Sequence, residues 1–217
     1  MGGRGASSSA TKLANKLTSG SGSHSFPIDL STVKGKSLQE IEDRIRHLDH
    51  EEAFIFDKNG NLINGVSGGT GSVDIPMNWF NEEGATITHG HPIGDRNFGG
   101  TLSFADVDVM AHSKWKEMRA AASGQGEMNY IVRRTSHSNS TGLQSRVAAD
   151  TPKMKANLQK TFLEAYTKAI KNGKPKKSAM HEAAQRAAGE VDRYWATVLP
   201  QFGFEYITRK KGYNYGR

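Results

Sequence analysis

The chain contains no cysteine, so disulfide bonds and thiolate metal sites are excluded. Any protein-bound metal therefore has to be held by His, Asp or Glu. The sequence also lacks an apolar run close to the roughly 20 residues that a transmembrane helix needs. Its first 23 residues include basic side chains but no apolar segment typical of a secretory signal. We therefore expect neither a signal peptide nor a membrane anchor, and a cytoplasmic location.

Apolar residues are scarce, and acidic residues are scarce toward the C-terminus. Hydrophobic residues make up 35 % of the chain and its mean hydropathy is -0.62, which indicates that part of it adds little to a core. Residues 151–217 hold 14 basic and five acidic side chains, whereas residues 25–150 hold 12 basic and 17 acidic ones. This asymmetry is typical of contact with nucleic acid or another polyanion, although a solvated helical surface has the same pattern. The candidate polyanion-binding residues are Lys174, Lys176, Lys177, Arg209, Lys210 and Lys211.

Composition divides the chain into three segments. Residues 1–25 are rich in Gly and Ser and are expected to be a disordered basic tail. Residues 26–150 alternate short apolar strands with helices, as in a domain of ordinary size. Residues 151–217 contain two apolar stripes at helical spacing, separated by a break at residues 172–175, which predicts a basic helical hairpin. The expected fold class is α/β in the α+β sense: a mixed sheet flanked by helices, followed by the hairpin.

Local patterns place the expected elements of the central segment. Capping boxes at Ser37/Glu40 and Ser103/Asp106 predict two helix starts, because each pairs a side-chain hydroxyl with a carboxylate three residues later. Residues 135–150 are polar and are expected to form an exposed loop. The predicted helices cover residues 38–49 and 103–114, and the predicted strands cover residues 52–56, 62–66, 85–89, 117–122, 128–133 and 201–208.

Two histidines that are separated by a single residue lie at the end of a predicted strand. Alternate residues of a strand share a face, so His89 and His91 can both reach one ion. Asp106 lies in the first turn of the following helix, where the free backbone N–H groups favour an ionised carboxylate. Three such ligands with a fourth position open are typical of a catalytic zinc site. We therefore predict Zn²⁺ at His89, His91 and Asp106.

A metal-dependent hydrolase also needs a proton acceptor and a group that stabilises negative charge. Glu51 and Glu52 stand where the first predicted helix leads into the sheet, and the spacing leaves both open as the base. Glu52 shares a face with Phe54 and Phe56, and Glu51 lies on the other face. Ser103 is placed to donate a hydrogen bond to an oxyanion that develops on an attacked carbonyl.

The order of these residues resembles that in the JAB/MPN (JAMM) metallopeptidases. A Glu precedes the strand EEAFIFDKNGNLI, the histidines end ATITHGHP, and the Ser and Asp begin SFADVDVMA. The resemblance covers about residues 37–135 and is nearest to bacterial and phage members, RadC-like or phage-structural. It implies a cytidine-deaminase-like mixed sheet and zinc-dependent hydrolysis of peptide or isopeptide bonds, as in a phage-encoded or toxin-like hydrolase. Glu52 would be the base and Ser103 the oxyanion partner.

The chain departs from the family in one spacing. Eleven residues separate His91 from Ser103, where the family usually has seven. Residues 95–100 are therefore expected to be an insertion that changes access of the peptide or protein substrate.

Two other readings stay open. A virion or assembly protein could keep the fold as a scaffold, with a protein assembly partner and a location in the virus particle. A nucleic-acid-directed protein could use the basic extensions to hold phosphates, in which case its binding would weaken steeply with salt.

Overall fold

The computed structural model describes residues 25–92, 100–124 and 126–211, and these form a seven-stranded sheet with four α-helices. The strands are β1 (Phe26–Pro27), β2 (Glu52–Phe56), β3 (Leu62–Ser67), β4 (Thr86–His91), β5 (Glu117–Ala122), β6 (Met128–Arg134) and β7 (Phe204–Lys210). The α-helices are α2 (Leu38–Ile45), α3 (Phe104–His112), α4 (Ser140–Lys171) and α5 (Lys176–Val198), and three short 3-10 turns are η1 (Leu30–Val33), η2 (Met77–Asn81) and η3 (Leu199–Phe202).

The sheet is mixed, with the strand order β1-β3-β2-β4-β5-β6-β7. Only β4 and β5 run parallel, and every other neighbouring pair is antiparallel. A parallel pair needs a crossover connection, which here contains α3. The predicted α+β class with a mixed sheet is therefore confirmed.

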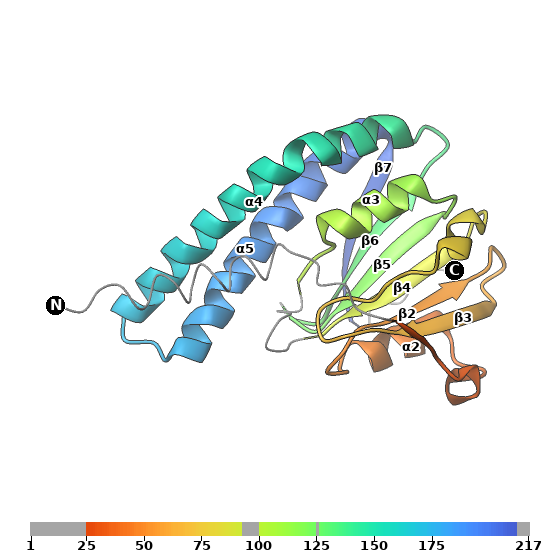
Figure 1. Ribbon diagram of the computed structural model, residues 1–217, viewed down its shortest axis with the longest axis horizontal. Coiled ribbons are helices and arrows are strands. Elements are labelled where there is room, and N and C mark those ends of the chain that lie inside the picture. The colour runs from red at the N-terminus through yellow and green to blue at the C-terminus, as the bar shows by residue number, and fades with distance from the viewer. Residues whose placement is uncertain (1–24, 93–99, 125, 212–217) are drawn as a thin grey trace.

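The two faces of the sheet are covered by different helices (Figure 1). On one face, α2 packs its Ile41 and Ile45 against Phe54 and Phe56 of β2. On the other, α3 and the base of the α4–α5 hairpin cover a larger core that includes Trp115 and Trp195. Side chains alternate along each strand, so neighbouring residues of β2 face different cores.

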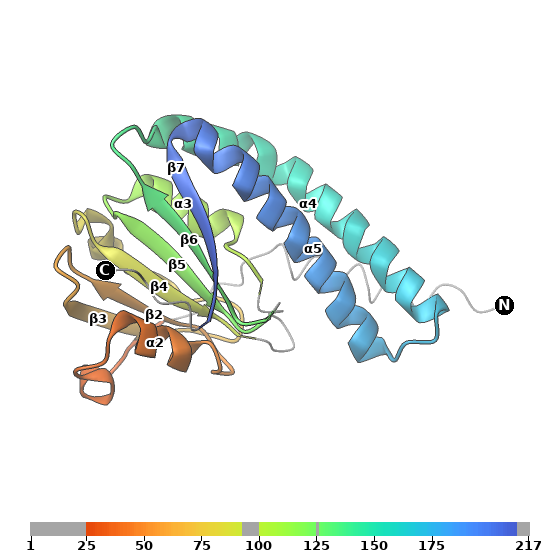
Figure 2. The same ribbon diagram turned by 180° about the vertical axis from the view of Figure 1, so that it is seen from behind.

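The C-terminal hairpin is partly built into the body of the protein. Leu143 near the start of α4, and Trp195 and Val198 at the end of α5, belong to the main core. Farther out the two helices contact each other through a small cluster around Phe162 and Ala183. Figure 2 shows this outer part projecting away from the sheet.

The expected loop at residues 135–150 is wrong, because α4 begins at Ser140. Asn139 caps this helix by accepting a hydrogen bond from the Gly142 N–H, and Leu143 and Val147 are buried one turn apart. The predicted boundary between residues 150 and 151 thus falls inside a continuous helix, which carries Pro152 in its interior.

The remaining predicted elements agree with the structure to within a few residues. The first helix ends at Ile45 rather than at residue 49, and the last strand occupies Phe204–Lys210 rather than residues 201–208. The predicted tail, residues 1–25, lies outside the described residues except for its last member, and so do residues 95–99 of the expected insertion. None of the described helices is both long enough and apolar enough to cross a membrane.

Candidate metal centre

The two histidines stand at the end of β4, on the face of the sheet that α3 covers. Ala53 pairs with His89 across β2 and β4, and both residues therefore point toward the main core. His91 lies two residues further along the same strand and shares this face. Both imidazoles are nearly buried, with side-chain exposures of 4 % for His89 and 9 % for His91.

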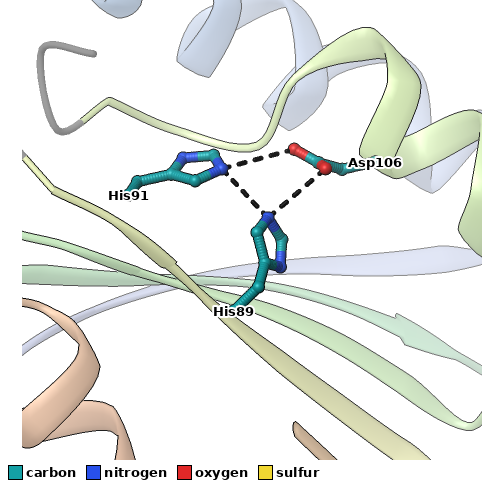
Figure 3. Close-up of side chains that lie close together, drawn as sticks. All are labelled: His89, His91 and Asp106. Carbon is teal, nitrogen blue, oxygen red and sulfur yellow. Dashed lines mark hydrogen bonds and ion pairs between the residues drawn. The ribbon is translucent and has the colours of Figure 1, made fainter. Parts of the chain in front are cut away.

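Asp106 meets both imidazoles from the first turn of α3. The Nε2 atoms of His89 and His91 are 2.9 Å apart. Asp106 Oδ1 lies 3.3 Å from His89 Nε2, and Asp106 Oδ2 lies 3.6 Å from His91 Nε2. Figure 3 shows the two rings and the carboxylate converging on one point. In the described part of the chain, this is the one group of three His, Asp or Glu residues that could hold a metal.

The capping box of α3 fixes the Asp106 carboxylate. Its Oδ2 accepts a 2.6 Å hydrogen bond from the Ser103 N–H, and the Asp106 N–H donates to Ser103 Oγ at 3.1 Å. Burial alone would raise the pKa of Asp106, but charge attraction and hydrogen bonding from His89, the charge of His91 and the Ser103 N–H together hold it well below its usual value. Asp106 is therefore an ionised carboxylate, the form that binds a metal.

The second nitrogen of each ring determines which atom is available to a metal. His91 Nδ1 lies 3.0 Å from the Gly100 carbonyl oxygen, so its N–H donates there and Nε2 keeps its lone pair. His89 Nδ1 is buried and has no hydrogen-bond partner among the residues that the structure describes. An ordinary helix cap accounts for the contact between Ser103 and Asp106, but it does not account for two imidazole nitrogens that converge on the same carboxylate.

The donor set fits a zinc ion. Three ligand atoms about 2.0–2.1 Å from a tetrahedral zinc lie about 3.3 Å from one another. The three contacts of 2.9, 3.3 and 3.6 Å between these side chains scatter around that value. Asp106 retains 19 % exposure, so its side chain is not wholly enclosed. Two imidazoles and one carboxylate are also a ligand set that zinc accepts.

The structure does not bring Glu52, the predicted base, to this cluster. Glu52 points to the opposite face of the sheet, where its carboxylate pairs with the Arg44 guanidinium and lies 3.4 Å from His50 Nε2. The physical reason is the alternation of strand side chains: Ala53 faces the histidines, so Glu52 faces α2.

Glu51 lies on the side of the histidines. Its backbone continues the ladder, with the Glu51 N–H donating to the Gly69 carbonyl and the Gly68 N–H donating to the Glu51 carbonyl, both at 2.8 Å. Extending the pairing of Ala53 with His89 by two residues puts Glu51 opposite His91. Glu51 is 5 % exposed.

The other predicted residues occupy separate places. Ser103 is exposed at the start of α3, adjacent to Asp106, and its Oγ accepts rather than donates in the capping box. Lys174, Lys176 and Lys177 lie at the tip of the hairpin, whereas Arg209 and Lys210 end β7, away from that tip in Figure 2. Lys174 pairs with Glu182, and Lys211 pairs with Glu127. The predicted basic residues therefore form two groups.

One contributor to this site, the Gly100 carbonyl, could not be predicted from the sequence, because any residue type can supply a backbone acceptor. Comparisons with family models, with curated proteins and with solved structures found no match to this chain.

Proposed function

We propose that this protein is a zinc-dependent hydrolase of peptide or isopeptide bonds, with the JAB/MPN-like arrangement of sheet, ligand strand and ligand helix. The observation that carries the proposal is the convergence of His89 Nε2, His91 Nε2 and the Asp106 carboxylate, whose ligand atoms all lie within 4.8 Å of one another. A parallel β4–α3–β5 unit supplies all three side chains, and this order supports the resemblance drawn from the sequence.

Each residue of the site has a separate role in this proposal. His89, His91 and Asp106 would hold the ion, which would supply a Lewis acid and lower the pKa of a water molecule toward about 7. Glu51, on the histidine face, accepts the proton of the attacking water and returns it to the leaving amine. The Ser103 hydroxyl keeps its proton in the capping box and donates it in a hydrogen bond to the oxyanion.

A cleavage screen tests this proposal. The zinc-loaded protein is incubated with libraries of linear peptides and of isopeptide-linked peptides, and products are identified by mass spectrometry. We expect cleavage that stops on chelation, returns with zinc and is lost in Asp106→Ala. The matched control is Asp108→Ala, which removes an exposed carboxylate from the same helix and should leave cleavage unchanged. Cleavage that survives in Asp106→Ala, or no cleavage of either library, would contradict the proposal.

A second function, binding of a polyanion such as nucleic acid, is favoured by the charge of the hairpin. Residues 153–186 contain nine Lys or Arg side chains and two acidic ones, and all nine basic side chains are exposed. Such a surface attracts phosphates mainly by releasing counterions, so the affinity depends on salt. Lys176 and Lys177, at the tip, belong to this exposed set.

A charge-reversal pair tests this second function. Lys176→Glu with Lys177→Glu is compared with Lys34→Glu and Lys36→Glu, which make the same charge change at exposed sites in the body. Binding of a fluorescent single-stranded oligonucleotide is measured from about 50 to 200 mM salt. We expect the hairpin pair to weaken binding and to reduce the slope of log affinity against log salt by roughly 1–2, with little change in the control pair. A flat salt response in the wild type would exclude phosphate binding.

A further inference from the structure

The segment at residues 100–102 connects the candidate metal centre to the C-terminal part of the chain. Its Gly100 carbonyl accepts the hydrogen bond from His91 Nδ1 at 3.0 Å. The position of this carbonyl therefore decides which tautomer His91 adopts and where its Nε2 points. A glycine carbonyl holds a fixed position only if other groups hold the chain beside it.

Residues from α5 and β7 hold this segment. Thr101 Oγ1 is 2.6 Å from the Tyr206 hydroxyl, and that hydroxyl donates to Asp192 Oδ1 at 2.7 Å. Because the phenol proton is given to Asp192, the Thr101 hydroxyl donates to Tyr206. The Trp195 Nε1–H donates to the Leu102 carbonyl at 2.8 Å. Thr101, Leu102 and Trp195 are all buried.

These bonds hold in the ionisation states expected at neutral pH. Burial, followed by the hydrogen bond to Asp192, raises the pKa of Tyr206 well above its usual value, so the phenol keeps its proton. The backbone of Gly100 is also closely approached, since a Cβ there would lie 3.1 Å from the Ala188 Cβ of α5. Helix α5 thus holds the segment directly through the Trp195 bond to Leu102 and indirectly through Asp192, which binds Tyr206, while Ala188 lies close to Gly100.

We propose that Tyr206 is a positioning residue of the metal centre: held by Asp192 and assisted by Trp195, it fixes residues 100–102 so that the Gly100 carbonyl orients His91. This inference rests on the proposed metal site. The three metal ligands all lie before residue 107. If the inference holds, α5 of the C-terminal hairpin and the last strand, β7, supply the groups that position one of these ligands, His91. The base of the hairpin is then part of the site, rather than an independent extension.

The test compares two tyrosine substitutions that remove the same kind of hydrogen bond. Tyr206→Phe deletes the hydroxyl that contacts Thr101 and keeps the ring. Tyr194→Phe is the matched control. The Tyr194 hydroxyl also donates to an aspartate, Asp150, at 2.7 Å, and this hydrogen bond does not involve residues 100–102. Zinc affinity is measured by competition with a chromogenic chelator. The His91 ring nitrogens are followed by NMR in the metal-free protein, at a pH at which the ring is neutral.

We expect Tyr206→Phe to weaken zinc binding by about 10- to 100-fold, and Tyr194→Phe to bind like the wild type. In the metal-free protein, His91 should be the Nδ1–H tautomer in the wild type and in Tyr194→Phe, and a mixture of tautomers in Tyr206→Phe. A purely structural role for Tyr206 would change the melting temperature but neither of these readouts.

The outcomes separate the inference from the proposed function. If the wild type binds zinc and Tyr206→Phe binds it equally well, or if both tyrosine variants lose affinity alike, the positioning role is overturned while the metal site stands. If the wild type takes up no zinc, the proposed function fails, and the His91 spectra still decide whether Tyr206 orients that ring. Unchanged His91 signals in Tyr206→Phe would then overturn the inference as well.

Discussion

Ala53 lies directly opposite His89 across the antiparallel pair of β2 and β4. This one pairing fixes the faces of two adjacent glutamates, because successive strand residues point in opposite directions. Glu52 is directed toward α2 and pairs with Arg44, whereas Glu51 is directed toward the side of His89 and His91. Two neighbouring carboxylates with similar burial therefore have different surroundings, and they are expected to have different roles.

Replacing each glutamate by glutamine separates these roles. Glu51→Gln should lower kcat for peptide or isopeptide cleavage by about 10²- to 10⁴-fold, because the amide does not accept a proton. Glu52→Gln should keep kcat within a few-fold of the wild type and instead lower the free energy of unfolding by about 1–2 kcal/mol, because the charge that pairs with Arg44 is lost. Steady-state kinetics and urea denaturation measure the two effects.

Zinc content is the control for both variants. Each should retain the ion, since neither carboxylate belongs to the three-residue cluster. A large loss of kcat in Glu52→Gln with full zinc content, together with an active Glu51→Gln, would reverse the assignment of the base.

The lowered pKa of Asp106 predicts how stability depends on pH. Because the folded-state pKa lies below the unfolded value of about 3.9, the carboxylate contributes stability above about pH 4 and loses it as the pH falls through the folded pKa. In chelator-treated protein, Asp106→Asn should therefore be less stable than the wild type at pH 6, by about 1–3 kcal/mol. The gap should close in the acid range. Urea denaturation at a series of pH values from 6 downward measures the difference, and a gap that widens toward acid would disprove this assignment.

A buried ionic network beneath α2 makes a further stability prediction. Glu42 is fully buried and accepts hydrogen bonds from Arg119 at 2.5 Å, Asn129 at 2.8 Å and Thr88 at 3.3 Å. Glu42→Gln should cost about 3 kcal/mol of unfolding free energy, because it leaves a buried guanidinium with less compensating charge. Glu182→Gln, which breaks an exposed pair with Lys174, is the control and should leave stability close to that of the wild type. Equal effects of the two substitutions in thermal or urea denaturation would contradict this account.

Local patterns in the sequence were sufficient to predict much of the fold. Both capping boxes, at Ser37 and Ser103, begin helices in the structure, and the apolar runs of β2, β4 and β6 form strands. The spacing of the two histidines and Asp106 also predicted which three side chains come together. These features depend on neighbours within a few residues, or on one short strand–loop–helix unit. The local sequence pattern is therefore enough to predict them.

Features set by distant contacts could not be predicted in the same way. The polar composition of residues 135–150 wrongly predicted a loop where α4 begins. The first turns of α4 are stabilised by Leu143 and Val147, which pack into a core formed by other elements. The choice between Glu51 and Glu52 depended on the register of β2 against β4, which neither strand reveals alone. The contact of Tyr206 with Thr101 joins residues that are 105 positions apart.

The amount of zinc bound per chain tests the central claim most directly. Purified protein is stripped with a chelator, reloaded at neutral pH and analysed by elemental mass spectrometry. Wild type and His112→Ala, which removes an exposed histidine on α3, should each bind about one zinc ion per chain, and His89→Ala should bind almost none. A wild type that takes up no zinc, or a His89→Ala variant that binds as much as the wild type, would contradict the claim that His89, His91 and Asp106 form a metal centre.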